Sequence, residues 1–137
     1  MRFLDTNVVL RYLTGDDPAK AQACYELFQR VQRGDEELFT TESVAAEVAY
    51  VLSSRRGLYR LGHAEIASRL HPILALRGVR LPQKLVCLRA LDFFARHEAL
   101  DFEDALALAH MERLGMTEIV SYDRDFDGIP GVTRGEP

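Results

Sequence analysis

The sequence predicts an α/β protein in which a short parallel sheet of four to five strands is covered on both faces by helices. Short apolar segments with β-strand character alternate with longer segments of helical periodicity, which is the pattern of parallel sheets. No linker, internal repeat or low-complexity tract interrupts the 137 residues. We therefore expect one domain over residues 1–137, long enough to bury a hydrophobic core.

The first half of the chain is expected to hold two strands and four helices. Phe3 and Leu4 form a very short buried strand, and residues 37–41 are also β-like. Apolar residues at helical spacing predict helices from about residue 6 to 13 and at 18–33, 44–52 and 63–76. Gly34 is expected to end the second helix, and Pro72 can end or kink the fourth.

The second half continues the alternation. Residues 78–82 suggest a brief extended segment, and residues 83–97 form a strongly amphipathic helix. Another helix begins near Asp101 or Phe102 and runs to Gly115. A strand at 118–121 is followed by an acidic turn at 123–127, and the turn-rich tail has room for one last short strand.

Composition excludes some function classes. The formal net charge of −4 does not suggest a generally basic nucleic-acid-binding surface, although a cluster of acids in one metal site would account for it. No segment approaches the roughly 20 apolar residues of a membrane span. We expect no secretory signal and a cytoplasmic location, with Cys24 and Cys87 as reduced, buried thiols.

Four acidic residues occupy positions that a solvated surface does not explain. Asp5 follows the first strand, and Asp123 follows the strand at 118–121 in the same way. Glu47 interrupts an apolar, alanine-rich helix, where burial without a partner would cost several kcal/mol. Asp104 lies in the first turn of a mostly apolar helix.

Each of these acids also has a simpler interpretation. Asp5 alone is equally consistent with a cap of the first helix. Asp104, like Asp101, is favoured by the dipole at a helix N-terminus. Asp123 suits a turn, and Glu47 could pair with an arginine.

Taken together, the four acids favour a metal site. The carboxyl ends of parallel strands and the starts of the following helices share one edge of a sheet, so the four carboxylates would converge there. Their mutual repulsion would be relieved by a divalent cation, and an all-oxygen donor set selects Mg²⁺ or Mn²⁺. The four histidines are scattered and offer no competing pattern. Such a site suits hydrolysis of phosphodiester bonds.

These motifs resemble those of the PIN-domain ribonucleases, and among them the VapC toxins of toxin–antitoxin pairs. The resemblance rests on four motifs in order, which span most of the chain: Phe3-Leu4-Asp5-Thr6-Asn7, the helix around Glu47, Asp101-Phe102-Glu103-Asp104-Ala105-Leu106 and Ser121-Tyr122-Asp123-Arg124-Asp125-Phe126. It implies a three-layer α/β/α PIN-like fold and an endoribonuclease dependent on Mg²⁺ or Mn²⁺.

The resemblance also assigns roles to residues. Asp5, Glu47, Asp104 and Asp123 would form the catalytic acidic quartet and bind the metal, with Glu47 binding it or positioning the attacking water. Asp101 and Asp125 are reserve ligands. Thr6, Asn7 and Ser121 are expected to hydrogen-bond to the ligands; the family more often has Thr where this chain has Ser121. Candidates for RNA contact are Arg11, Arg55, Arg56 and Arg60, with Tyr12 or Tyr59 as stacking residues.

The family further implies a structured RNA substrate such as a transfer RNA or ribosomal RNA loop, a VapB-type antitoxin and a homodimer. An alternative is a catalytically silent PIN-like module that binds RNA or a protein. A phosphatase of the haloacid dehalogenase type is a third possibility, but it requires Asp-x-Asp on the first strand, where this chain has Asp5-Thr6-Asn7.

Overall fold

Helices and short strands alternate along the whole chain in the computed structural model, which describes residues 1–137. No helix is both long enough and apolar enough to cross a bilayer. The elements in order are β1 (Arg2–Phe3), α1 (Thr6–Thr14), α2 (Pro18–Arg33), β2 (Leu38–Phe39), α3 (Glu42–Ser53), α4 (His63–Ala75), β3 (Val79–Arg80), α5 (Lys84–Arg96), α6 (Phe102–Leu114), β4 (Glu118–Val120), the 3-10 helix η1 (Arg124–Gly128) and β5 (Thr133–Gly135).

The helix boundaries follow from local chemistry. The Asp17 side chain accepts a hydrogen bond from the backbone N–H of Lys20 at 3.2 Å and so caps α2. The same helix ends at Gly34, whose positive φ of 85° suits glycine. Pro72 lies within α4 without ending it. The helices predicted from apolar periodicity are all present, with ends shifted by one or two residues.

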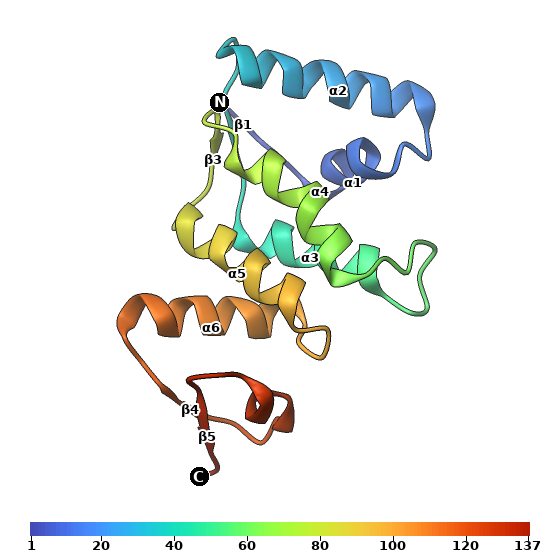
Figure 1. The fold of residues 1–137 in the computed structure, drawn as a ribbon. Coiled ribbons are helices and arrows are strands. Elements are labelled where there is room, and N and C mark those ends of the chain that lie inside the picture. The colour runs from blue at the N-terminus through green and yellow to red at the C-terminus, as the bar shows by residue number, and fades with distance from the viewer.

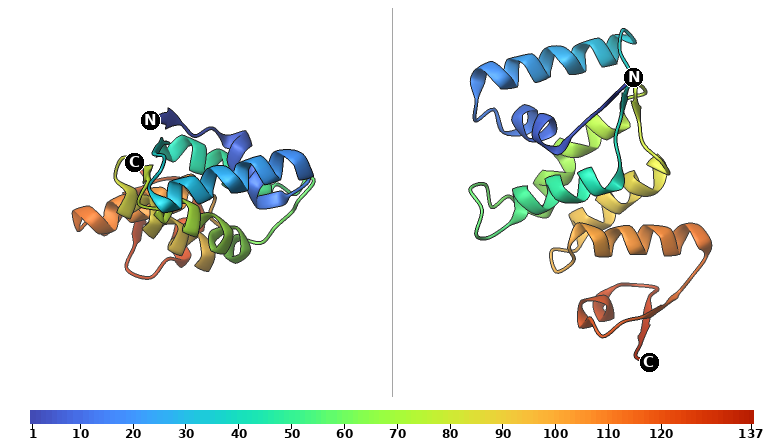
Figure 2. Two further views of the ribbon diagram at one scale, coloured as in Figure 1. Left: turned by 90° about the horizontal axis from the view of Figure 1, so that it is seen from above. Right: turned by 180° about the vertical axis from the view of Figure 1, so that it is seen from behind.

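All the strand pairs are parallel, as expected, but they belong to two sheets. The first sheet has the order β1-β2-β3, and the second pairs β4 with β5. Figures 1 and 2 show the second sheet beyond α6, at the end of the molecule opposite α2. The outer edges of β1 and β4 are consequently unpaired, and Phe3 and Val120 on these strands are exposed.

The α/β class with parallel strands is therefore confirmed, whereas the single central sheet of four to five strands is not what forms. The physical reason lies in α6, which has apolar residues on two sides. Phe102, Ala105 and Ala109 belong to the main core, whereas Leu108 and Met111 pack in a second, smaller core with Phe126 of η1. The C-terminal segment thus packs on the side of α6 that faces away from the first sheet.

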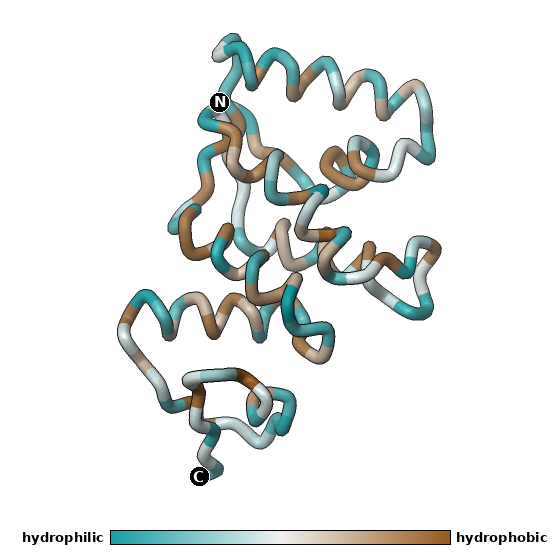
Figure 3. Tube along the Cα trace, in the orientation of Figure 1, coloured by the Kyte–Doolittle hydropathy of each residue, from teal (hydrophilic) through white to brown (hydrophobic).

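The main hydrophobic core lies among the first sheet and the six helices. Twenty-five buried residues form it, including Leu4 next to β1, Leu38 in β2, and Val48 and Leu52 on α3. Figure 3 shows apolar positions recurring along the helices with hydrophilic positions between them. This is the pattern expected when each helix buries one face and leaves the other in solvent.

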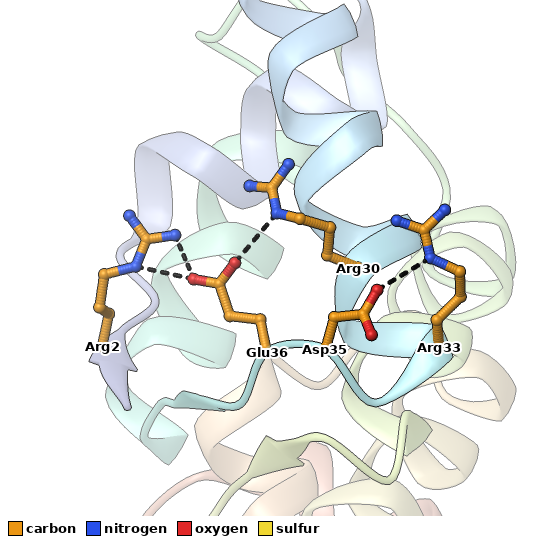
Figure 4. Close-up of polar contacts among 5 residues, drawn as sticks. All are labelled: Arg2, Arg30, Arg33, Asp35 and Glu36. Carbon is orange, nitrogen blue, oxygen red and sulfur yellow. Dashed lines mark hydrogen bonds and ion pairs between the residues drawn. The ribbon is translucent and has the colours of Figure 1, made fainter.

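A cluster of charged residues ties β1 to the segment after α2 (Figure 4). Arg2 Nε donates to Glu36 Oε1 at 2.8 Å, and Arg30 Nε donates to Glu36 Oε2 at 3.2 Å. Arg33 pairs separately with Asp35. The two arginines, Arg2 first, lower the pKa of Glu36, so this carboxylate stays charged between them.

Candidate functional site

Asp5 lies at the point where the backbone leaves the first sheet and enters α1. The preceding residue, Leu4, is 1% exposed, and its N–H donates to the Phe39 carbonyl oxygen at 2.7 Å. The Thr40 hydroxyl donates to the Leu4 carbonyl oxygen at 3.0 Å. Asp5 occupies the N-cap position of α1, yet its side chain makes no capping hydrogen bond. Its exposed carboxylate is therefore available to a ligand, and the interpretation of Asp5 as a simple helix cap is wrong.

The next residue connects the start of α1 to α3. Thr6 is buried, and its Oγ1 donates to Glu47 Oε2 at 2.7 Å. Glu47 itself is exposed and forms no ion pair with an arginine. The hydrogen bond fixes one carboxylate oxygen of Glu47 beside the residue that follows Asp5. Asp5, Thr6 and Glu47 thus form the first group of the candidate site.

A second group lies at the N-terminus of α6. Asp101 caps this helix by accepting a hydrogen bond from the backbone N–H of Asp104 at 2.8 Å. Partial burial and the neighbouring carboxylate of Asp101 raise the pKa of Asp104 to about 6, with a smaller contribution from Asp123 in the same direction. Asp104 is therefore a carboxylate destabilised by other acids, the electrostatic situation that a cation relieves.

The segment after β4 places Asp123 near this second group. The Ser121 hydroxyl accepts a hydrogen bond from the backbone N–H of Asp123 at 3.0 Å. Asp123 Oδ1 accepts from the backbone N–H of Asp125 at 2.9 Å and thereby caps η1. Both aspartate side chains are exposed. Asp123 therefore stabilises the turn, as its simpler interpretation predicts, and its charge also raises the pKa of Asp104.

The contacts described above link the predicted acids in two groups. Asp5 and Glu47 belong to the first group, and Asp101, Asp104 and Asp123 belong to the second. No three carboxylate, imidazole or thiol side chains lie close enough to share one metal ion. The all-oxygen donors suit Mg²⁺ or Mn²⁺ chemically, but their placement does not form a complete ion site in this conformation.

A cavity of about 340 Å³ separates Glu47 from the N-terminus of α6. We call it the α3–α6 cavity. Sequence reasoning identified Glu47 and Asp101 in its wall but missed Tyr50 and Glu103. Tyr50 follows Glu47 by three residues in a helix, so helical spacing alone could have placed both on one face. The lining consists of Ser43, Ala46, Glu47, Ala49, Tyr50, Ser53, Phe94, Asp101, Phe102 and Glu103.

Some of the proposed RNA-contact residues are already engaged within the protein. Arg11 donates to Asp16 at 3.0 Å, and Tyr59 donates to the other oxygen of Asp16 at 2.5 Å. Tyr12 packs edge-on against Phe28, with ring centroids 4.8 Å apart.

The remaining candidates lie at the surface. Arg55 and Arg56 are exposed and form no ion pair, and Arg60 donates to the Gly57 carbonyl oxygen at 3.4 Å. Asn7 is exposed and lines a shallow cavity with Arg11 and Cys24 instead of contacting the acids. Among the RNA-contact candidates, Arg55 and Arg56 therefore remain the freest.

His63 and the two cysteines are placed as structural residues. His63 is buried, stacks on Phe94 with a centroid separation of 3.7 Å, and has Nδ1 3.1 Å from the Phe94 carbonyl oxygen. Cys24 and Cys87 are both free, and burial raises the pKa of the Cys87 thiol to about 12. A thiol with such a pKa is inert at neutral pH.

Comparisons with known proteins agree with the resemblance in the motifs. A VapC ribonuclease of Mycobacterium bovis and the ribonuclease VapC13 of Mycobacterium tuberculosis are each 27% identical to the chain over 136 residues, which cover 98% of both sequences. A VapC ribonuclease of Aquifex aeolicus is 26% identical over 126 residues, covering 92% of this chain and 90% of the relative. The family model for the PIN domain matches residues 2–132. The chain therefore belongs to the PIN domain family.

Proposed function

We propose that this protein is a metal-dependent endoribonuclease and the toxin component of a type II toxin–antitoxin system. Membership of the PIN domain family supports the proposal, as do three relatives of nearly equal length that are named VapC ribonucleases. The reaction is hydrolysis of a phosphodiester bond, in which water adds to phosphorus and the bond to the leaving oxygen breaks.

The observation that carries this proposal is the arrangement of Asp5, Thr6 and Glu47. The backbone before Asp5 is held by the sheet, while the carboxylate of Asp5 makes no capping bond. The buried hydroxyl of Thr6 orients Glu47 at 2.7 Å. Asp17 and Asp101, at the same position of α2 and α6, do use their side chains for capping. Asp5 and Glu47 are instead held by the fold with oxygens left free for a ligand.

The proposed cofactor is Mg²⁺ or Mn²⁺, with Asp5, Glu47, Asp104 and Asp123 as its ligands and Asp101 and Asp125 as further candidates. Carboxylate oxygens are the donors these ions prefer. The ion would draw its ligands from both groups of acids. Because the pKa of Asp104 is raised to about 6, the ion must displace a proton from this residue at lower pH.

We further propose the RNA substrate and the partners. The substrate is a structured RNA, such as a loop of transfer or ribosomal RNA, which places the protein in the cytoplasm. The partner is a small VapB-type antitoxin, and the toxin forms a homodimer. These proposals rest on the VapC names of the relatives.

The test is to incubate the purified protein with total RNA in EDTA, in Mg²⁺ and in Mn²⁺, and to sequence the RNA ends. We expect discrete new ends with either metal and none in EDTA. The separation of the two acid groups favours one alternative, a catalytically silent module that binds RNA or protein. An intact RNA profile under all three conditions would support that alternative and reject the nuclease.

A further inference from the structure

The α3–α6 cavity has a chemical character that metal binding does not explain. Its volume of about 340 Å³ lies in the range of small-molecule sites. One wall is the exposed face of α3, which carries Glu47 and Tyr50, and the opposite wall is the first turn of α6. The cavity therefore adjoins Glu47 of the proposed catalytic site without containing Asp5 or Asp104.

Tyr50 is the most unusual residue of this cavity. It is 71% exposed, although it belongs to a helix whose other large residues are mostly buried. Its ring packs against no other aromatic side chain. Exposed tyrosines of this kind present a flat apolar face on which an unpaired nucleobase can stack.

The buried side of the cavity is also aromatic. Phe94 and Phe102 line it, and their ring centroids lie 6.0 Å apart in an edge-to-face arrangement. Both rings are almost fully buried, so they close the inner side of the cavity and expose little surface of their own. The aromatic ring available to a planar ligand is therefore that of Tyr50.

The polar groups of the cavity restrict that ligand further. Asp101 is engaged with the backbone N–H of Asp104, whereas the exposed carboxylate of Glu103 forms no hydrogen bond or ion pair. Ionised carboxylates only accept hydrogen bonds, and they repel phosphate. A ligand that presents N–H donors therefore matches the carboxylate of Glu103. Guanine fits best, because its N1–H and N2–H₂ groups point the same way and match the two oxygens of one carboxylate.

We propose that the α3–α6 cavity is a nucleobase subsite that binds an unpaired guanine of the RNA, with Tyr50 stacking on the base and Glu103 accepting its N–H donors. The sugar–phosphate backbone then lies outside the cavity. Arg55 and Arg56, two and three residues beyond Ser53 at the end of α3, are exposed cations within the same stretch of chain. This inference rests on the proposed function and adds sequence preference to it.

The test measures binding separately from cleavage. Fluorescein-labelled pentaribonucleotides UUGUU, UUAUU and UUCUU, and UUIUU with inosine, are titrated in EDTA and followed by anisotropy. We expect UUGUU to bind at least about fivefold more tightly than UUAUU, because adenine offers no matching pair of donors. Inosine keeps N1–H but lacks the 2-amino group, so UUIUU should bind with intermediate affinity.

Variants separate the contributions of Tyr50 and Glu103 to RNA binding. Tyr50→Ala should weaken binding of every oligonucleotide at least about fivefold, while Tyr50→Phe keeps the affinity. Glu103→Gln should remove the preference for UUGUU over UUAUU. Tyr25→Ala is the matched control, since Tyr25 is a 48% exposed tyrosine on α2 outside the cavity.

Two outcomes would overturn the inference: Tyr50→Ala binding RNA as well as Tyr25→Ala does, or a guanine preference that survives in Glu103→Gln. Circular dichroism of each variant identifies any loss of folding. Tyr50→Phe keeps the aromatic ring, so its affinity separates the loss of stacking from a loss of folding. The proposed nuclease activity is tested separately by RNA cleavage in Mn²⁺. Its failure would leave the binding result intact, and failure of the guanine preference would leave cleavage intact.

Discussion

The Thr6 hydroxyl donates a hydrogen bond of 2.7 Å to Glu47, across 41 residues of sequence. It joins the residue next to Asp5 to the middle of α3, so the first sheet and α3 position the two acids together. Removing this hydrogen bond should therefore affect RNA cleavage more than the stability of the fold.

Thr6→Val keeps the shape of the buried side chain and removes the donor. Glu47 is exposed, so water can replace the lost partner, and we expect the free energy of unfolding to change by no more than about 1 kcal/mol. RNA cleavage in Mn²⁺ should fall by about tenfold or more, as is usual when a group that orients a ligand is lost. Thr6→Ser retains the hydroxyl and should stay close to wild type. Equal activity of the valine and serine variants would show that the hydrogen bond does not position Glu47.

Asp104 should make the metal-free protein less stable as the pH rises. Its pKa is about 6 in the folded protein, against an ordinary aspartate value of 3.8 in the unfolded chain, so between these values the folded state holds more protons than the unfolded state. Stability is then lost as the pH increases from about 4 to about 6, and the loss persists above that. In EDTA at pH 7.5, Asp104→Asn should melt at a higher temperature than wild type. At pH 3.5 the difference should disappear, and a variant that melts lower at pH 7.5 would contradict the raised pKa.

Arg55 and Arg56 should contribute more to RNA binding than Arg11. The Arg11 guanidinium is held by Asp16, whose pKa is lowered to about 2 by hydrogen bonds from Tyr59 and from Arg11 itself. Replacing either Arg55 or Arg56 by Gln should reduce the slope of log affinity against log salt by about 1, the signature of one lost phosphate contact. Arg11→Gln should leave the slope unchanged. If Arg11→Gln reduced the slope and neither Arg55→Gln nor Arg56→Gln did, the RNA would contact the start of α1.

Gly78 should be required for stability and not for activity. A Cβ at this position would lie 2.8 Å from Val31 Cγ1 and 3.1 Å from the carbonyl oxygen of Glu36. Gly78→Ala should therefore lower the free energy of unfolding by about 1–3 kcal/mol in urea titrations. Gly128→Ala is the control, because nothing lies within 4 Å of its added Cβ and its φ is not positive. Similar stability of the two variants would show that the contact between Gly78 and α2 relaxes without cost.

Helix positions could be predicted well because each helix carries its own signal. The spacing of apolar residues identifies α2 without reference to any other segment, because Pro18 marks its start and Gly34 its end. Pro72 is the ambiguous case: it can end a helix, but α4 continues through it. Strand pairing is different, because β1 and β4 have only two and three residues, and the partner of β1 lies two helices further along the chain.

The candidate site shows the same limit: its residues could be predicted, but not every contact between segments that are distant in sequence. The four acids could be named as candidates from their positions in the pattern, and the Thr6 and Ser121 hydroxyls do form hydrogen bonds with Glu47 and with the backbone of Asp123. The placement of Asp123 could not be predicted, since it depends on which side of α6 the C-terminal segment packs. The second core, with Phe126 beside Leu108, decides that side.

The central claim is that acids from both groups serve one metal-dependent cleavage reaction. It is tested most directly by measuring RNA cleavage in Mn²⁺ by wild type, Asp5→Asn and Asp104→Asn, with Asp35→Asn, an exposed acid paired with Arg33, as the control. We predict that Asp5→Asn and Asp104→Asn each lose at least about 100-fold in rate while remaining folded, and that Asp35→Asn cleaves like wild type. Full activity of either Asp5→Asn or Asp104→Asn would contradict the claim.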